Sequence, residues 1–346
     1  MRRLFLTSLV VLFSVNGSFA CTSFLLENGT TQLFAKNYDW DLEHGYVLVN
    51  KRNVRKRAMQ VRPQQKVVEW TSKYGSATLN QYGRELPNSG LNEKGLAVEI
   101  LWLDSTQYPG ADERPVINEL QWIQYTLDNF STTAEVLQNA DKIRIENFYA
   151  NTHYLVCDRS GECATFEYID GELVTHSGNQ LAPKLITNNT QEESARQLAK
   201  FEGFGGTSKA PSDASSLSRY VRAATLMKTA PVTVDGVLDV LEKVRQGKYT
   251  KWNVIYNLAD NDVSFRTLNF PALKSFKLNF DYSCKTPVVG FPLETTKGGD
   301  ITSDFAVYTK EMNEKLVERS MASLGQIGKK LGKGLAAYPA STVCTE

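Results

Sequence analysis

The sequence is poor in histidine: its 346 residues include only His44, His153 and His176, which are far apart. Their spacing does not resemble that of clustered zinc ligands. The sequence therefore predicts neither a zinc site nor a catalytic pair of cysteine and histidine. We interpret each histidine as a surface or packing residue and expect no metal or other cofactor.

An excess of charge of one sign is also absent. The chain has 39 basic and 38 acidic residues, or 37 and 38 once Arg2 and Arg3 are removed with a leader peptide. This balance argues against nucleic acid or an anionic membrane as the main partner. Beyond residue 20 no apolar run approaches the ~20 residues of a membrane span, so we expect no stable membrane insertion after the leader is removed.

The first twenty residues have the pattern of a signal peptide. Arg2 and Arg3 form a charged start, Leu4 to Phe13 an apolar run, and Ser18-Phe19-Ala20 a cleavage signal of small residues around a central one. Residues 1–20 are therefore predicted to be removed, and the protein to be exported, either periplasmic or secreted.

Cutting after Ala20 would make Cys21 the first residue of the mature chain. Its thiol would then lie beside a free α-amine, which titrates near pH ~8 and can accept the thiol proton. Asn28-Gly29 between two apolar runs predicts a hairpin turn, which would return Lys36 and Asp39 to the neighbourhood of Cys21.

Two other roles of Cys21 stay open. Bacterial lipoproteins also begin at a cysteine after a leader, although their processing prefers a small residue where Phe19 stands and a branched aliphatic one where Ser18 stands. In that case the protein would be an exported lipoprotein or a ligand-binding module. Alternatively, Cys21 would be half of a structural disulfide.

The other four cysteines form an even set, which favours two disulfides in an exported chain. Cys157 and Cys163 flank a turn-like sequence and can lie opposite each other in a hairpin. We therefore expect Cys157 to pair with Cys163 and Cys284 with Cys344, leaving Cys21 free.

Strand and helix patterns alternate in blocks along the chain, which favours two stacked sheets with helices outside. The helix predictions rest on apolar spacing and caps. They cover the pattern Val116 to Leu127 with Pro115 in its first turn, Thr132 to Ala140, Glu192 to Phe204, Ser218 to Thr229, Val234 to Arg245 and a tail from Glu311 to Tyr338. Because four glycines weaken the second half of the tail, residues 311–346 are expected to form a frayed, solvated helical appendage held by Cys344.

The ordered motifs resemble the choloylglycine hydrolase family of N-terminal nucleophile hydrolases, which comprises bile salt hydrolases and penicillin V acylases. The resemblance runs from residue 21 to about 225. It rests on Cys21-Thr22, Asn37-Tyr38-Asp39-Trp40, the segment from Trp70 to Gly75, the segment from Asn92 to Leu96, Thr187-Asn188-Asn189 and the segment from Ser218 to Arg222. It implies an α+β fold, a four-layer αββα sandwich, over residues 21–310.

The resemblance also implies catalytic roles. Cys21 would be the nucleophile, Asp39 would hold its amine, and Arg219 would support the site. Asn188 would donate to the oxyanion, with the backbone N–H of Trp102 as second donor. Lys36 stands where the family usually has arginine, which keeps the charge but loses the planar fork.

The implied substrate is a small-molecule linear amide. Trp102 stands where many bile salt hydrolases have asparagine, and Trp40 follows Asp39 directly. The two indoles resemble the penicillin V acylases of Gram-negative bacteria and could stack against an aromatic acyl group. An acyltransferase or a ceramidase-like amidase on the same fold stays an alternative. The resemblance also favours a homotetramer.

Overall fold

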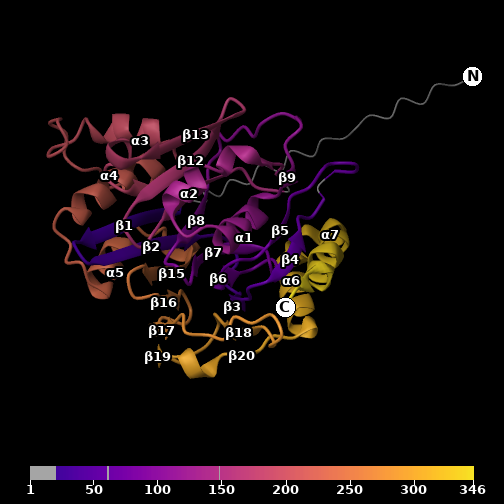
Figure 1. The fold of residues 1–346 in the computed structure, drawn as a ribbon. Coiled ribbons are helices and arrows are strands. Elements are labelled where there is room, and N and C mark those ends of the chain that lie inside the picture. Colours follow the sequence, from indigo (N-terminus) through magenta and orange to yellow (C-terminus); the bar gives the residue numbers. More distant parts are fainter. Residues whose placement is uncertain (1–20, 61, 148) are drawn as a thin grey trace, which may run out of the picture.

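The computed structural model describes residues 21–346 except 61 and 148 (Figure 1). The predicted leader and its cleavage signal lie outside the described residues. Within these residues the strands form two large antiparallel-rich sheets and two small ones.

The first large sheet contains the strand pair that begins at Cys21. In spatial order its strands are β14 (Leu185–Ile186), β1 (Thr22–Asn28), β2 (Thr31–Asp39), β15 (Thr250–Asn257), β16 (Asp262–Thr267), β17 (Lys274–Lys277) and β19 (Gly299–Asp300). The predicted hairpin turn is present: Asn28 pairs with Thr31, and Gly29 between them has the positive φ of 59° that the turn requires.

The second large sheet is made of the middle of the chain and two late strands. Its order is β13 (Glu172–Ser177), β12 (Cys163–Ile169), β11 (Thr152–Cys157), β8 (Ala97–Trp102), β7 (Pro87–Asn92), β6 (Ser76–Asn80), β3 (Tyr46–Asn50), β18 (Val289–Pro292) and β20 (Ala306–Val307). The small sheets are β10 (Arg144–Ile145) with β9 (Val116–Ile117), and β21 (Val343–Cys344) with β4 (Val54–Arg57) and β5 (Glu69–Thr71).

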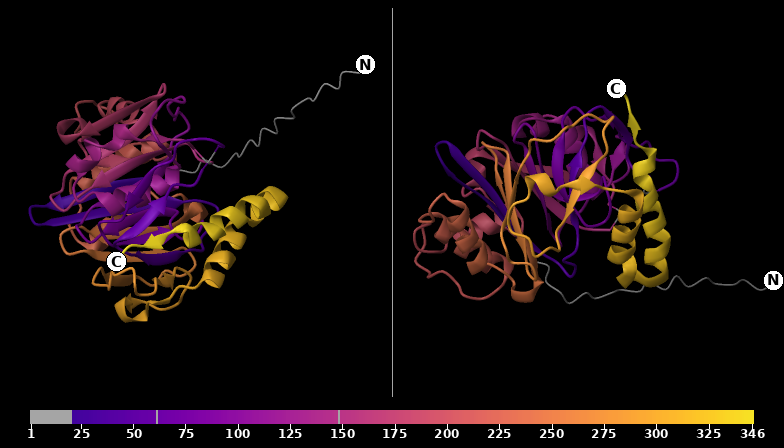
Figure 2. Two further views of the ribbon diagram at one scale, coloured as in Figure 1. Left: turned by 45° about the vertical axis from the view of Figure 1, so that its right-hand side comes forward. Right: turned by 90° about the horizontal axis from the view of Figure 1, so that it is seen from below.

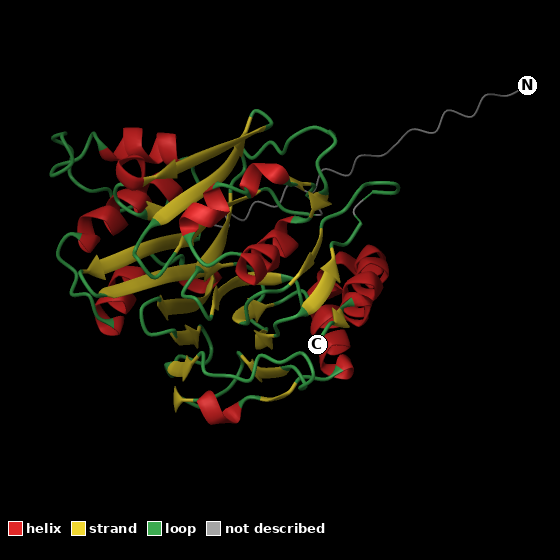
Figure 3. Ribbon diagram, in the orientation of Figure 1, coloured by secondary structure: helices red, strands yellow, loops and turns green. Residues whose placement is uncertain are grey.

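Helices cover the outer faces of both large sheets (Figure 3). One apolar cluster lies between the sheets and contains Phe34 and Val254 of the first and Leu101 and Leu155 of the second. A second cluster joins the outer face of the second sheet to two helices, and a third joins the outer face of the first sheet to three. These are α1 (Glu119–Asn129), α2 (Thr133–Leu137), α3 (Gln191–Leu198), α4 (Ser216–Met227) and α5 (Val234–Lys243). The predicted αββα order is confirmed.

Some predicted boundaries are wrong. The helix expected from Val116 starts only at Glu119, because Val116 and Ile117 pair with β10 and the Asn118 side chain caps the helix by accepting the N–H of Leu120 and of Gln121. The helix expected to reach Phe204 ends at Leu198, after which the chain folds back and Phe201 bridges to Ser208.

The C-terminal tail forms a hairpin of two helices, α6 (Lys310–Met321) and α7 (Gly325–Ala337), that lie side by side (Figure 2). The expectation of a frayed appendage is wrong, because Val317, Met321 and Leu335 are buried together with Leu86. Its glycines instead permit close packing: a Cβ at Gly328 would lie 2.0 Å from the Met321 carbonyl oxygen.

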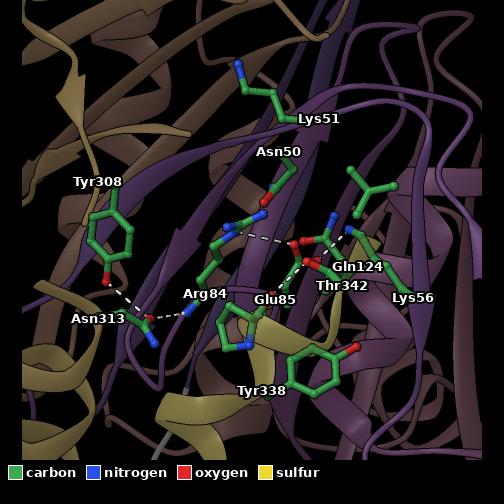
Figure 4. Close-up of polar contacts among 12 residues, drawn as sticks. Asn50, Lys51, Lys56, Arg84, Glu85, Gln124, Tyr308, Asn313, Tyr338 and Thr342 are labelled. Atoms are coloured by element: carbon green, nitrogen blue, oxygen red, sulfur yellow. Dashed lines mark hydrogen bonds and ion pairs between the residues drawn. The ribbon is translucent and has the colours of Figure 1, made fainter. Parts of the chain in front are cut away.

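Polar contacts tie the same hairpin to the body of the protein (Figure 4). The Asn313 Oδ1 atom of α6 accepts the backbone N–H of Arg84 at 2.8 Å and the Tyr308 hydroxyl at 3.3 Å. Beside them Glu85 lies 2.5 Å from the ammonium of Lys56, and both side chains are fully buried. The tail is therefore part of the folded molecule.

Both predicted disulfides are present, Cys157–Cys163 and Cys284–Cys344. Cys157 and Cys163 are direct cross-strand partners of β11 and β12, as the turn between them suggested. Cys21 is free and buried.

Candidate active site

The β1–β2 hairpin places Cys21 beside Asp39. Thr22 pairs with Asn37, so the residue before Thr22 meets the end of β2. The Cys21 Sγ atom accepts the backbone N–H of Asp39 at 3.4 Å. Cys21 is 5% exposed, and this burial raises the pKa of its thiol to about 11, although the nearby charge of Lys36 acts in the opposite direction.

Within the described part of the chain, only one of the two carboxylate oxygens of Asp39 accepts a hydrogen bond. Its Oδ1 atom accepts a hydrogen bond from the hydroxyl of Thr250 on β15. Its Oδ2 atom is buried and has no hydrogen-bond partner among the residues that the structure describes. Burial raises the pKa of Asp39 to about 6, against the opposing effect of Arg219.

Arg219 joins the nucleophile to the candidate oxyanion donor. Ser215 caps α4 by accepting the N–H of Ser218, and the next helical residue carries the guanidinium into the site. Its Nη1 donates to the Cys21 carbonyl at 2.8 Å and to the Thr22 hydroxyl at 2.6 Å, and its Nη2 donates to the Asn188 Oδ1 atom at 3.0 Å. Burial lowers the Arg219 pKa to about 10, so it stays charged at neutral pH.

Asn188 is held at the end of β14, which pairs with β1 through Ile186 and Ser23. Because Arg219 occupies Oδ1, the amide nitrogen must point the other way, where Nδ2 donates to the Trp102 carbonyl at 2.7 Å. An amide nitrogen carries two protons, so a second donation remains chemically possible.

The backbone of Trp102 faces the same side as Asn188. Trp102 stands opposite Thr152 in the β8–β11 ladder, and the next N–H, that of Leu103, donates to the Asn151 carbonyl at 3.0 Å. Since backbone groups alternate between the two edges of an antiparallel strand, the Trp102 N–H and carbonyl both point away from β11. Both predicted oxyanion donors therefore lie on one side of β8.

The positive charge of Lys36 lowers the pKa of the Cys21 thiol, but its ammonium makes its hydrogen bonds and ion pair with groups of β8. Its Nζ atom lies 2.8 Å from Glu99 Oε2 and donates to the Ile100 carbonyl at 2.5 Å. Burial raises the pKa of Glu99 to about 7, and the attraction of Lys36 opposes this shift. The sequence analysis did not identify Glu99, although a glutamate within the apolar run Ala97 to Leu103 was a signal of a buried partner.

The two tryptophans lie together, with ring centroids 6.1 Å apart at an interplanar angle of 37°. The Trp40 Nε1–H donates to the Tyr82 hydroxyl at 2.8 Å, and the Trp102 Nε1–H donates to Asp104 at 2.5 Å. Both indoles are partly exposed. Thr250 and Tyr82 were not identified from the sequence, because only the fold brings them to Asp39 and Trp40.

The structure thus brings Cys21, Asp39, Asn188 and Arg219 together within hydrogen-bonding reach of one another or of a shared neighbour. Across residues 21–346, apart from 61 and 148, no three His, Cys, Asp or Glu side chains are grouped so that they could hold a metal ion. No helix among the same residues is long and apolar enough to span a membrane.

Comparison with known proteins gives the same family from sequence and from structure. Residues 21–193 match the family model for linear amide C–N hydrolases of the choloylglycine hydrolase family. A penicillin V acylase of Pectobacterium atrosepticum is 29% identical over 266 residues, which is 69% of this chain and 69% of that protein. A bile salt hydrolase/transferase of Lactiplantibacillus plantarum is 24% identical, over 59% of this chain and 77% of that protein.

Solved structures agree on the fold. The penicillin V acylase of Agrobacterium tumefaciens superposes with a TM-score of 0.70 at 25% identity, covering 84% of this chain and 98% of that one. A conjugated bile acid hydrolase variant from Clostridium perfringens superposes with a TM-score of 0.66 at 18% identity, covering 81% and 98%. This chain therefore belongs to the choloylglycine hydrolase family and is a linear amide C–N hydrolase.

Proposed function

We propose that this chain is cut after Ala20, is exported, and hydrolyses a linear amide through a thioester on Cys21. The observation that carries the proposal is the unpartnered Oδ2 atom of Asp39. A buried carboxylate oxygen without a partner is costly, and an α-ammonium or α-amine on Cys21 would supply the missing donor. Before cleavage the nitrogen of Cys21 belongs to a peptide bond, and cleavage after Ala20 would turn it into the free amine that can donate to Asp39 Oδ2.

In the proposed reaction the neutral α-amine takes the thiol proton, and the thiolate attacks the substrate carbonyl. The tetrahedral oxyanion accepts hydrogen bonds from the Asn188 amide and the Trp102 N–H. Collapse breaks the C–N bond, and the leaving amine takes the proton from the α-ammonium. Water then attacks the thioester, which releases the acid and restores the thiol.

For the substrate we propose an amide with an aromatic or amphipathic acyl group, as in penicillin V acylases. The partly exposed pair of Trp40 and Trp102 beside Asn188 supports this choice, since indoles stack well on aromatic rings. We propose a homotetramer as the oligomeric state, which sedimentation at several protein concentrations tests.

The first test is the N-terminus of the exported protein. Sequencing should read Cys21-Thr22-Ser23-Phe24, and the intact mass should show no acyl chains. A blocked or lipidated terminus would contradict the proposal and favour the lipoprotein alternative.

The second test is an amide-release assay with penicillin V, conjugated bile acids and long-chain acyl homoserine lactones. Cys21→Ser should fold but lose most activity, because a hydroxyl is a far poorer proton donor than a thiol. Asn188→Ala should lower kcat by ~10²- to 10³-fold with a smaller effect on KM. Full activity of Cys21→Ser would overturn the mechanism, and no turnover of any of these amides by a protein with a free Cys21 would overturn the substrate assignment.

A further inference from the structure

His153 links the two large sheets directly beside Asn188. It lies on β11, opposite Leu101 of β8, and its side chain is completely buried. Its Nε2 atom is 2.8 Å from the carbonyl oxygen of Thr187, the residue before Asn188, which follows β14 of the other sheet. Of the two roles expected for this histidine, surface or packing, the structure shows a packing residue, and its ring nitrogens also have polar partners.

The partners of the ring determine where its proton lies. A carbonyl oxygen can only accept, so Nε2 must carry the hydrogen that joins His153 to Thr187. The other ring nitrogen, Nδ1, is 3.1 Å from Glu167 Oε1, and a hydrogen bond between these two atoms requires one further hydrogen, on Nδ1 or on the carboxyl. Glu167 also accepts the backbone N–H of Gln191, at 2.9 Å through Oε1 and 3.2 Å through Oε2. The carboxylate is thus fixed by β12 and by the start of α3, and it fixes the imidazole in turn.

Other titratable groups face this pair from the surrounding elements. On β13 the His176 Nδ1 atom is 3.8 Å from Glu167 Oε2. On α4 the Tyr220 hydroxyl is 3.4 Å from the Gln191 side chain, and burial, with a smaller contribution from the charge of Glu167, raises the pKa of that tyrosine to about 12. The Lys36–Glu99 ion pair lies farther along the same two sheets, on β2 and β8.

Thr187 and Asn188 are also held from the helix side. Ser216 Oγ accepts the Asn188 N–H at 2.8 Å and donates to the Thr187 hydroxyl at 3.0 Å. Arg219 fixes the amide oxygen of Asn188. The contact of His153 with the Thr187 carbonyl completes this support from the second sheet, which also carries Trp102.

We propose that His153, oriented by Glu167, is a positioning residue that holds the Thr187 carbonyl and thereby sets the Asn188 amide for the oxyanion. The inference rests on the proposed function, in which Asn188 is an oxyanion donor. Without the imidazole the Thr187–Asn188 segment would shift toward α4, and a displacement of about 1 Å at such a donor can cost ~10²-fold in rate.

The test compares His153→Leu with His176→Leu, the same change at a histidine that contacts Glu167 but not Thr187. We expect His153→Leu to lower kcat for penicillin V by ~10- to 100-fold with little change in KM, and His176→Leu to stay near wild type. His153→Gln should recover part of the loss, because its amide can donate to the carbonyl. Alkylation of Cys21 by iodoacetamide should proceed at the wild-type rate in every variant, since displacement at carbon forms no oxyanion.

An unchanged kcat in His153→Leu, or equal losses of kcat and of alkylation rate in that variant, would overturn the inference. The proposed function would still stand if Asn188→Ala lowers kcat. If His153→Leu does not fold, His153→Phe keeps a planar ring but has no donor for the Thr187 carbonyl, and an unaltered kcat in that variant overturns the inference. If the wild-type protein hydrolyses none of the amides, the proposed substrate is wrong. The inference is then tested by crystal structures of the wild-type protein and of the His153 variants. The Asn188 amide should be displaced from the Trp102 carbonyl in His153→Leu or His153→Phe, and an undisplaced amide overturns the inference.

Discussion

At the scale of single residues, the Cys21 thiol is protected while the chain continues through Ala20. Burial raises its pKa to about 11, so at neutral pH only a small fraction is thiolate. A free α-amine, which titrates near pH ~8, would supply a base where the chain before cleavage has an amide. In the proposed function, leader removal therefore creates the base and gives Asp39 a donor at the same moment.

Asp39 gives a pH-dependent test on a chain that carries a short Gly-Ser extension before Cys21. Its folded-state pKa is about 6, above the ordinary value of 3.8, because the ionised form is poorly solvated. The ionised carboxylate therefore opposes folding above pH 6, and this cost disappears as the pH falls toward 3.8. We expect Asp39→Asn to raise the free energy of unfolding by up to about 3 kcal/mol at pH 7.5 and by almost nothing at pH 4.

Denaturant unfolding at the two pH values measures this difference. The same substitution in the chain that begins at Cys21 should lose amide hydrolysis, because the α-amine loses its charged partner. Equal stability of variant and parent at pH 7.5 would show that the buried carboxylate carries no cost.

Lys36 gives the second residue-scale prediction. Lys36→Met leaves Glu99 without its partner in a buried site, which should destabilise the protein by about 3–5 kcal/mol. Adding Glu99→Gln removes the unpaired carboxylate and should restore most of that stability. Alkylation of Cys21 should be slow in both variants, since the positive charge that favours the thiolate is gone from both. Restored alkylation in the double variant would contradict a role of Lys36 at the thiol.

The sequence alone supported the residues with local signals, and it missed those defined by contact. Cys21 followed from the leader pattern, and Asp39 was placed near it by the Asn28-Gly29 turn. Glu99, Thr250 and Tyr82 lie far from the nucleophile in sequence, and their roles arise only when β8, β15 and the segment after β6 are packed together.

At the scale of elements, two helix starts could be predicted from local patterns and a third was not. Thr132 caps α2, as its capping-box pattern predicted, and α5 begins at Val234, the first residue of its predicted helical pattern. The Val116 to Leu127 spacing was misleading, because its first apolar residues belong to a strand whose partner, β10, lies about thirty positions later. Pairing with a distant strand leaves no local signal, and the local signal of the true boundary was the N-cap residue Asn118, which the apolar spacing hid.

The glycines of α7 provide a matched pair of substitutions. Gly328→Ala would place a Cβ 2.0 Å from the Met321 carbonyl, so the two tail helices must separate, and we expect a loss of about 1–3 kcal/mol in unfolding free energy. Gly334→Ala meets no atom within 4 Å and removes backbone freedom from the unfolded chain, so it should stabilise by about 0.5–1 kcal/mol. Thermal unfolding of both variants checks the opposite signs. A stable Gly328→Ala would show that α6 and α7 are not in tight contact.

At the scale of the whole molecule, the layers could be predicted and the attachment of the tail could not. Alternating blocks of strands and helices indicated two sheets with helices outside, because each sheet must bury both faces. The glycine-rich tail is predicted to be only weakly helical when it is considered alone. Its burial depends on Leu86 and on the backbone N–H of Arg84, which donates to Asn313. A pattern within the tail cannot reveal a surface supplied by residues more than two hundred positions away.

The two disulfides should contribute unequally to whole-molecule stability. Cys157–Cys163 spans 6 positions and Cys284–Cys344 spans 60, so the loop-entropy model assigns them about 2 and about 4 kcal/mol. The long-range bond also joins the strand β21, paired with β4, to the segment after β17. We therefore expect Cys284→Ser/Cys344→Ser to lower the thermal unfolding midpoint clearly while amide hydrolysis well below that midpoint persists, because neither cysteine belongs to the site around Cys21.

The two disulfides also differ in the solvent exposure of their cysteines. Cys344 is exposed and Cys284 partly exposed, whereas Cys157 and Cys163 lie in the core between the sheets. Because thiol exchange requires a thiolate to reach the sulfur, mild reduction of the native protein should open Cys284–Cys344 first. Alkylation followed by peptide mass mapping should then find label on these two cysteines before Cys157 or Cys163, and the midpoint should fall to that of the double serine variant. Labelling of Cys157 first would mean that the second sheet opens more readily than the tail detaches, contrary to its complete burial.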